Sequence, residues 1–169
     1  MKQEEYKAAA EYWDVKDAGS VKMERAELLA EVEAYINANN TCALATASGN
    51  FVRCTPIEYT YRDGAFWFFS EGGKKFVALE MNQNVCQTIF DRYEGFGKLK
   101  GMQVSGTAKI IEPYSKEYIE VAKDKKISIE ALKKLSHPMY LIRVTPIRID
   151  FLNSDFKAKG CAYRQFIEF

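Results

Sequence analysis

Histidine is nearly absent from this sequence, and its scarcity excludes several kinds of chemistry. The single histidine, His137, is followed by Pro138, a setting in which a structural role is far more common than a catalytic one. A Ser-His-Asp triad would have to include His137, and no Gly-x-Ser-x-Gly turn is available to present a nucleophile. Metal sites made of several histidines are excluded for the same reason. The acidic residues are spread along expected helices, and no pair of them is suited to acid–base catalysis.

Cysteines are few, and the apolar runs are short. The cysteines are Cys42, Cys54, Cys86 and Cys161. Their wide spacing excludes a Cys-x-x-Cys pair for zinc or redox chemistry. The densest apolar runs, 42–47 and 65–69, are far below the ~20 residues needed to cross a bilayer. The first residues contain no apolar stretch resembling an export signal. We therefore expect reduced thiols, a cytoplasmic location and no membrane partner.

The chain also lacks an excess of charge of one sign. Lysine and arginine together number 24 and the acidic residues 23, which gives a net charge of +1. This balance argues against a nucleic-acid partner, although a local basic patch can still bind phosphate. The 169 residues fit one folded domain, and the aromatic content of 14% suits a β-rich core or a site for a flat ring.

The order of helical and strand patterns predicts a mainly β fold of the α+β class. Residues 1–24 form an expected N-terminal helical extension, and residues 25–169 form the main domain. Further helices are expected after residue 25, at 74–81, at 115–122 and at 128–135. Six strands are expected at 41–47, 51–61, 65–70, 85–93, 102–111 and 140–152, the last interrupted near Pro146. Because parallel crossovers are missing, we expect an antiparallel barrel whose ligand binds outside or at a seam.

A cluster of basic and hydroxyl residues is the strongest candidate site. Arg53 lies in the second expected strand, Ser70 ends the third, and Lys74 and Lys75 follow a Gly-Gly loop at the start of a helix. Adjacent antiparallel strands would bring these groups together, and such a set suits a phosphate dianion. The alternative is an ordinary loop with solvated lysines.

Seven short motifs appear in a characteristic order. They are Cys42-Ala-Leu-Ala-Thr-Ala47, Arg53-Cys-Thr-Pro56, Asp63-Gly64, Phe66-Trp-Phe-Phe-Ser70, Lys74-Lys75, Asn84-Val85 and Met102-Gln-Val-Ser-Gly-Thr-Ala108. With them, residues 25–152 resemble the pyridoxamine 5′-phosphate oxidase-like family of FMN-binding proteins. The resemblance implies a six-stranded antiparallel split β-barrel with a Greek-key element and peripheral helices. It also implies a homodimer with FMN at the subunit interface.

The resemblance assigns roles to individual residues. It implies that Arg53, Ser70, Lys74 and Lys75 hold the FMN phosphate. The backbone of Thr55, Pro56 and Ile57 would line the isoalloxazine ring, and Gln103 would approach its polar edge. No metal ligand and no catalytic side chain are implied.

Three departures from the family pattern concern activity. Met102 stands in place of an arginine beside Gln103, and Glu58 stands where the oxidases carry a lysine. The tail keeps Arg164 but lacks the histidine of the oxidases' Arg-x-His motif, which argues against vitamin B6 oxidation. The sequence therefore predicts an FMN-dependent oxidoreductase acting on an unidentified small molecule, with NAD(P)H as a candidate electron donor. The alternatives are a non-catalytic flavin- or heme-binding storage module and a deazaflavin-dependent reductase.

Overall fold

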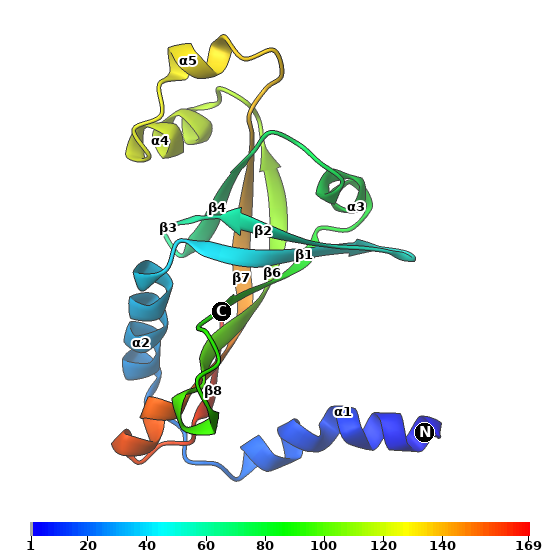
Figure 1. Ribbon diagram of the computed structural model, residues 1–169, viewed down its shortest axis with the longest axis vertical. Coiled ribbons are helices and arrows are strands. Elements are labelled where there is room, and N and C mark those ends of the chain that lie inside the picture. The colour runs from blue at the N-terminus through cyan, green and yellow to red at the C-terminus, as the bar shows by residue number, and fades with distance from the viewer. Residues whose placement is uncertain (1) are drawn as a thin grey trace.

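The computed structural model describes residues 2–169, so Met1, the first residue of the expected extension, lies outside it. Within these residues one antiparallel sheet of eight strands dominates the fold (Figure 1). Its order is β2-β1-β5-β6-β7-β4-β3, with β8 also on β7. The strands are β1 Thr41–Ser48, β2 Phe51–Glu58, β3 Thr60–Arg62, β4 Ala65–Ser70, β5 Asn84–Phe90, β6 Lys100–Ile111, β7 Tyr140–Asn153 and β8 Arg164–Glu168. The helices are α1 Gln3–Ala18, α2 Arg25–Ala38, α3 Lys75–Met81, α4 Lys116–Asp124 and α5 Ile129–Lys133.

The sheet curls because one continuous segment of the chain forms the strands at both of its edges. β2 pairs with β1, and after Tyr59 the chain continues as β3, which pairs with β4. Tyr59 is buried at this break, where its backbone N–H donates to Asn40 O and its hydroxyl to Ile36 O, both at 2.7 Å. The pairing between β3 and β4 ends at Thr60 and Trp67. Beyond that pair β2 and the end of β4 are not joined, and we call this opening the seam.

The expected fold class is confirmed, but the expected number of six strands is wrong. The break at Tyr59 divides the second expected strand into β2 and β3, and the tail adds β8. β7 is one continuous strand through Pro146, but it carries an irregularity there: Ser105 and Gly106 of β6 face Arg148 and Pro146, so Ile147 of β7 has no partner in the register. β5 ends at Phe90 and does not reach residue 93.

Helix α2 closes one side of the barrel interior. It begins at Glu24, whose carboxylate accepts hydrogen bonds from the backbone N–H groups of Ala26 and Glu27. Its inward face buries Leu28, Val32, Tyr35 and Ile36 in the same cluster as Phe66 and Phe68 of β4. This packing confirms the helical spacing of apolar residues seen in the sequence.

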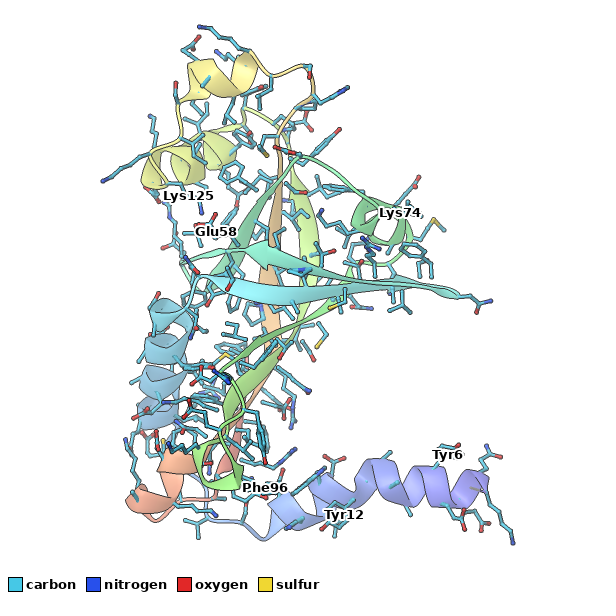
Figure 2. The ribbon with its side chains drawn as sticks, in the orientation of Figure 1. Tyr6, Tyr12, Glu58, Lys74, Phe96 and Lys125 are labelled. Carbon is cyan, nitrogen blue, oxygen red and sulfur yellow. The ribbon has the colours of Figure 1, made fainter. Side chains whose placement is uncertain are left out.

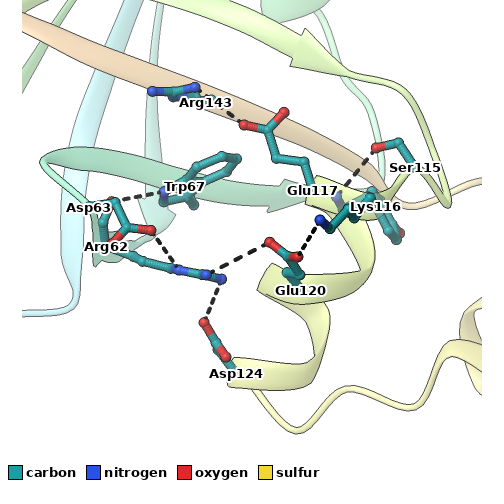
Figure 3. Close-up of polar contacts among 10 residues, drawn as sticks. Arg62, Asp63, Trp67, Ser115, Lys116, Glu117, Glu120, Asp124 and Arg143 are labelled. Carbon is teal, nitrogen blue, oxygen red and sulfur yellow. Dashed lines mark hydrogen bonds and ion pairs between the residues drawn. The ribbon is translucent and has the colours of Figure 1, made fainter.

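Helices α4 and α5 cover the outer face of β4. Ala65 and Trp67 project into their cluster, whereas the alternate residues of β4 face the barrel interior. Arg62 ties the β3–β4 hairpin to α4 through Asp124 at 2.7 Å and Glu120 at 3.9 Å (Figure 3). Arg143 of β7 pairs with Glu117 at 3.2 Å and lies over the ring of Trp67. These contacts fix the position of α4 beside the seam.

Helix α1 projects away from the barrel, and none of its residues is buried (Figure 1). One residue of β8 holds it: Arg164 pairs with Asp17 at 3.1 Å and stacks on Trp13 at 4.4 Å. None of the described helices is long and apolar enough to cross a membrane.

The Gln87 amide has no hydrogen-bond partner within the described structure, although the residue is fully buried on β5. Its cross-strand neighbours are Leu44 and Val104. Because an unsatisfied buried amide costs more than an apolar group of similar shape, Gln87→Leu is expected to raise the free energy of unfolding by about 1 kcal/mol. Denaturant unfolding measures this.

The matched control is Gln165→Leu. Gln165 is equally buried but accepts a hydrogen bond from Met23 N and donates to Val21 O and Ala162 O. Its replacement is expected to destabilise the protein by about 1 kcal/mol or more. If Gln87→Leu destabilises as Gln165→Leu does, an internal water satisfies Gln87 and the prediction is wrong.

Candidate functional site

The cationic cluster lies where the seam opens. Ser70 ends β4, and its hydroxyl accepts a hydrogen bond from Gly72 N at 3.2 Å and donates to Gly72 O at 3.0 Å. Lys75 folds back and donates from Nζ to the same carbonyl. Gly72 and Gly73 have φ angles of 133° and 103°, which glycine adopts readily and other residues rarely do. The Gly-Gly turn thus places Lys75 beside Ser70 through the shared Gly72 carbonyl, and Lys74 precedes it in the chain.

Arg53 reaches this cluster from β2 across the seam. Its charge acts on Lys75: burial and, after it, the repulsion from Arg53 lower the pKa of the Lys75 amine below its ordinary value of 10.5. Lys75 is only 6% exposed. In residues 2–169, Arg53, Lys74 and Lys75 form no ion pair with a carboxylate. The cluster therefore carries positive charge that an anion would neutralise.

The strand segment Thr55–Ile57 provides an open backbone edge beside the cluster. β2 pairs with β1 on one side only, so its other edge faces the seam with no strand partner in the described chain. Thr55 and Ile57 are half-buried and point to the same side as Arg53, whereas Pro56 points outward. Free backbone groups on such an edge can hydrogen-bond a flat polar ligand.

Gln103 lies apart from the other expected site residues of the same chain. It projects outward from β6, since its neighbours Met102 and Val104 are buried in the barrel. In the register it is joined to Pro56 through Thr88 and Ala43, so three strand spacings, about 14 Å, separate the two. One chain thus assembles Arg53, Ser70, Lys74 and Lys75, but does not bring Gln103 to them.

Gln103 instead lines a cavity of about 440 Å³ between α1 and the outer face of the sheet. Asp14 and Asp17 come from α1, and Arg148 and Arg164 come from β7 and β8. Arg148 is held by Asp150 at 2.7 Å and by Glu168 at 3.1 Å. Sequence reasoning missed this cavity, because it depends on a contact between the two ends of the chain. The only sequence signal for the cavity was Arg164, the arginine that the C-terminal tail keeps.

Glu58, at the far end of β2, has an ion-pair partner that the sequence did not suggest. Lys125, directly after α4, places Nζ 3.0 Å from the Glu58 carboxylate, and its side chain is only 18% exposed. Figure 2 shows this pair at one end of the seam region and Lys74 at the other. Lys125 thus places a basic group beside position 58, where the resemblance implied a lysine in the strand itself.

The cysteines and acidic residues offer no second centre. All four cysteines are free thiols, and burial raises the pKa of the Cys42 thiol to about 12. Within residues 2–169, no group of three or more histidine, cysteine or acidic residues is arranged to hold a metal ion. The cationic cluster and the cavity are therefore the sites that the side chains define.

Together, the curled antiparallel sheet and its peripheral helices define a split-barrel protein with a cationic cluster at its seam. Residues 28–153 match the model of the pyridoxamine 5′-phosphate oxidase family. Since this segment is well over half of the sequence, the chain belongs to that family.

Solved structures support the fold at low sequence identity. The heme storage protein HutZ of Vibrio cholerae is 17% identical, with a TM-score of 0.58 over 69% of this chain and 87% of its own. A FAD-binding protein of Mesorhizobium loti is 22% identical, with a TM-score of 0.57 over 72% and 89%. General stress protein 26 of Bacillus anthracis is 19% identical, with a TM-score of 0.60 over 84% and 98%. No curated protein matches the chain.

Proposed function

We propose that this protein binds FMN in the seam and works as a flavin-dependent oxidoreductase. The observation that carries the proposal is the cluster of Arg53, Lys74 and Lys75, which has no carboxylate partner in the described chain and stands beside an open strand edge. The phosphate would be held by these cations and by Ser70. The backbone of Thr55, Pro56 and Ile57 would line the isoalloxazine ring.

A homodimer with FMN at the subunit interface accounts for the position of Gln103. Within one chain Gln103 faces outward from β6, about 14 Å from Pro56 along the register. In a symmetric dimer formed over that face, Gln103 of one subunit would approach the ring held by the other. The geometry of the single chain thus favours a site completed by a second copy.

Bound FMN would supply the transfer of electrons to or from a small molecule, with NAD(P)H as a candidate donor. The tasks of this chain's own residues are to grip the phosphate, align the ring and limit water around it. Vitamin B6 oxidation is not part of the proposal. The tail lacks the histidine of the oxidases, and Asp17 already pairs with Arg164.

A heme-storage function receives less support from the side chains. HutZ shares the fold, but the single histidine of this chain, His137, is exposed in the connection between α5 and β7. It therefore lies on the side of the molecule that carries α4 and α5, outside the cationic cluster. A deazaflavin cofactor with a phosphate tail would use the same cluster and is separated from FMN by direct competition.

The test is equilibrium binding to the purified apoprotein, followed by flavin fluorescence. We expect FMN to bind at least about tenfold more tightly than riboflavin, since the phosphate adds charge-assisted hydrogen bonds of about 1.5–3 kcal/mol each. Equal affinities would show that the cluster does not hold the phosphate. A Soret band with hemin and no response to FMN would favour the storage function.

A further inference from the structure

We propose that Lys125 is a positioning residue for the ring end of the cofactor, where its positive charge favours the reduced form. The inference rests on the proposed function, because it concerns the same seam. It adds the residue directly after α4, which neither the family match nor the motifs assign.

The first argument is where the Lys125–Glu58 pair lies. α4 packs on the outer face of β4 through Trp67, and Glu58 projects from the outer face of β2. The 3.0 Å ion pair therefore links the two sides of the seam, the β2 side and the side formed by β4 and α4. Glu58 is two residues before Thr60, the residue of β3 whose pairing with β4 closes the seam. The Glu58–Lys125 ion pair therefore lies at the closed end of the seam.

The second argument is that Lys125 is held in place from both sides. Asp124, just before it, pairs with Arg62 at 2.7 Å. Lys126, just after it, has a φ of 58°, in the left-handed region that ends a helix and redirects the chain. A lysine side chain only 18% exposed, between these two constraints, does not move freely in solvent.

The third argument is the length of β2. Arg53 and Glu58 are five residues apart, which spans about 17 Å in an extended strand. A cofactor whose phosphate lies at Arg53 and whose ring runs along Thr55–Ile57 would end near Glu58. Lys125 therefore lies at the ring end, opposite the phosphate.

A cation at this place has a defined effect on reduction. Uptake of two electrons from dithionite, the reductant in the test below, and of one proton from water would add one negative charge to the ring system. Lys125 would stabilise that charge, and Glu58 would partly offset the stabilisation while it fixes the lysine. Loss of Lys125 should therefore favour the oxidised form, and neutralisation of Glu58 should favour the reduced form.

The experiment compares the reduction potential of FMN bound to the full chain and to variants, with dithionite as reductant and a reference dye. We expect Lys125→Met to shift the ratio of reduced to oxidised cofactor about tenfold, which lowers the two-electron potential by about 30 mV. Lys125→Arg should keep the parent potential, and Glu58→Gln should raise it. Lys116→Met, which removes a 93% exposed lysine at the start of α4, should leave it unchanged.

The outcomes separate this inference from the proposed function. If the parent binds FMN and Lys125→Met has the parent potential, the inference is overturned and the proposed function stands. If the parent does not bind FMN, both fall. Thermal unfolding of the apoprotein checks that Lys125→Met keeps its fold, because a partly exposed ion pair contributes only about 0.2–1 kcal/mol. If Lys125→Arg lowers the reduction potential as much as Lys125→Met does, Lys125 acts through its packing and not through its charge.

Discussion

Replacement of Arg53 and Lys75 by methionine, together, is expected to weaken FMN binding by at least about a hundredfold. Each residue would contribute a charge-assisted hydrogen bond of about 1.5–3 kcal/mol to the phosphate, so the pair supplies several kcal/mol. Methionine keeps the aliphatic stem that packs at the buried Lys75. Fluorescence titration of the folded variant measures the loss.

The matched control removes the same charge elsewhere. Arg92 and Lys109 are both exposed, and neither forms an ion pair in residues 2–169. Arg92→Met combined with Lys109→Met should therefore change FMN affinity less than about threefold. If the Arg53/Lys75 variant also stays within threefold, the phosphate does not bind at the seam.

The pKa of Lys75 gives the same prediction a second readout. Burial and Arg53 lower the pKa of this amine in the apoprotein, so between that lowered value and 10.5 the unfolded chain binds more protons. The contribution of Lys75 to apoprotein stability therefore rises with pH across this window. A bound phosphate dianion offsets both causes, so NMR titration should find a higher Lys75 pKa after FMN is added. An unchanged pKa would place the phosphate elsewhere.

Gly106→Ala is expected to lower the free energy of unfolding by about 2 kcal/mol. A Cβ at Gly106 would stand 2.6 Å from the carbonyl oxygen of Thr145 and 3.0 Å from Val144 Cγ1. The nearest atom belongs to the backbone of β7, at the point where the β6 register shifts, so it cannot turn away as a side chain would. For a chain of this length the melting temperature should fall by roughly 4–8 °C.

Gly97→Ala is the control for this effect. No heavy atom lies within 4 Å of a Cβ at Gly97, and its φ is not in the left-handed region. Alanine should be neutral or slightly stabilising there, because it reduces the freedom of the unfolded chain. If both variants have the same melting temperature as the parent, the strands at Gly106 are more loosely packed than the structure indicates.

Hairpins and the cationic cluster could be predicted from the sequence because local turn chemistry builds them. Asp63 and Gly64 adopt positive φ angles of 52° and 71°, as the Asp-Gly pair between two strand patterns predicts. Ser70 and Lys75 are joined by a short glycine turn, so their proximity follows from the six residues 70–75. For Arg53 the expected strand pairing is wrong in detail: only β3 pairs with β4, and Arg53 acts on Lys75 across the unpaired seam.

β8 and the cavity could not be predicted, because contacts between distant segments create them. In β8 the inward positions are Gln165 and Ile167, and a buried glutamine breaks the apolar alternation that marks a strand. Two of the three hydrogen bonds of Gln165, with Met23 N and Val21 O, go to residues more than 140 positions earlier in the chain. In the same way, no local pattern joins Glu58 to Lys125, since the position of α4 is decided by its packing on β4.

The cavity and the seam are built from different stretches of the polypeptide. The family match ends at Asn153, the last residue of β7, and it includes every residue of the cationic cluster. Two walls of the cavity, α1 and β8, lie outside the matched segment, at opposite termini. Exchange of the two terminal segments would therefore rebuild the cavity and leave Arg53, Ser70, Lys74 and Lys75 unchanged.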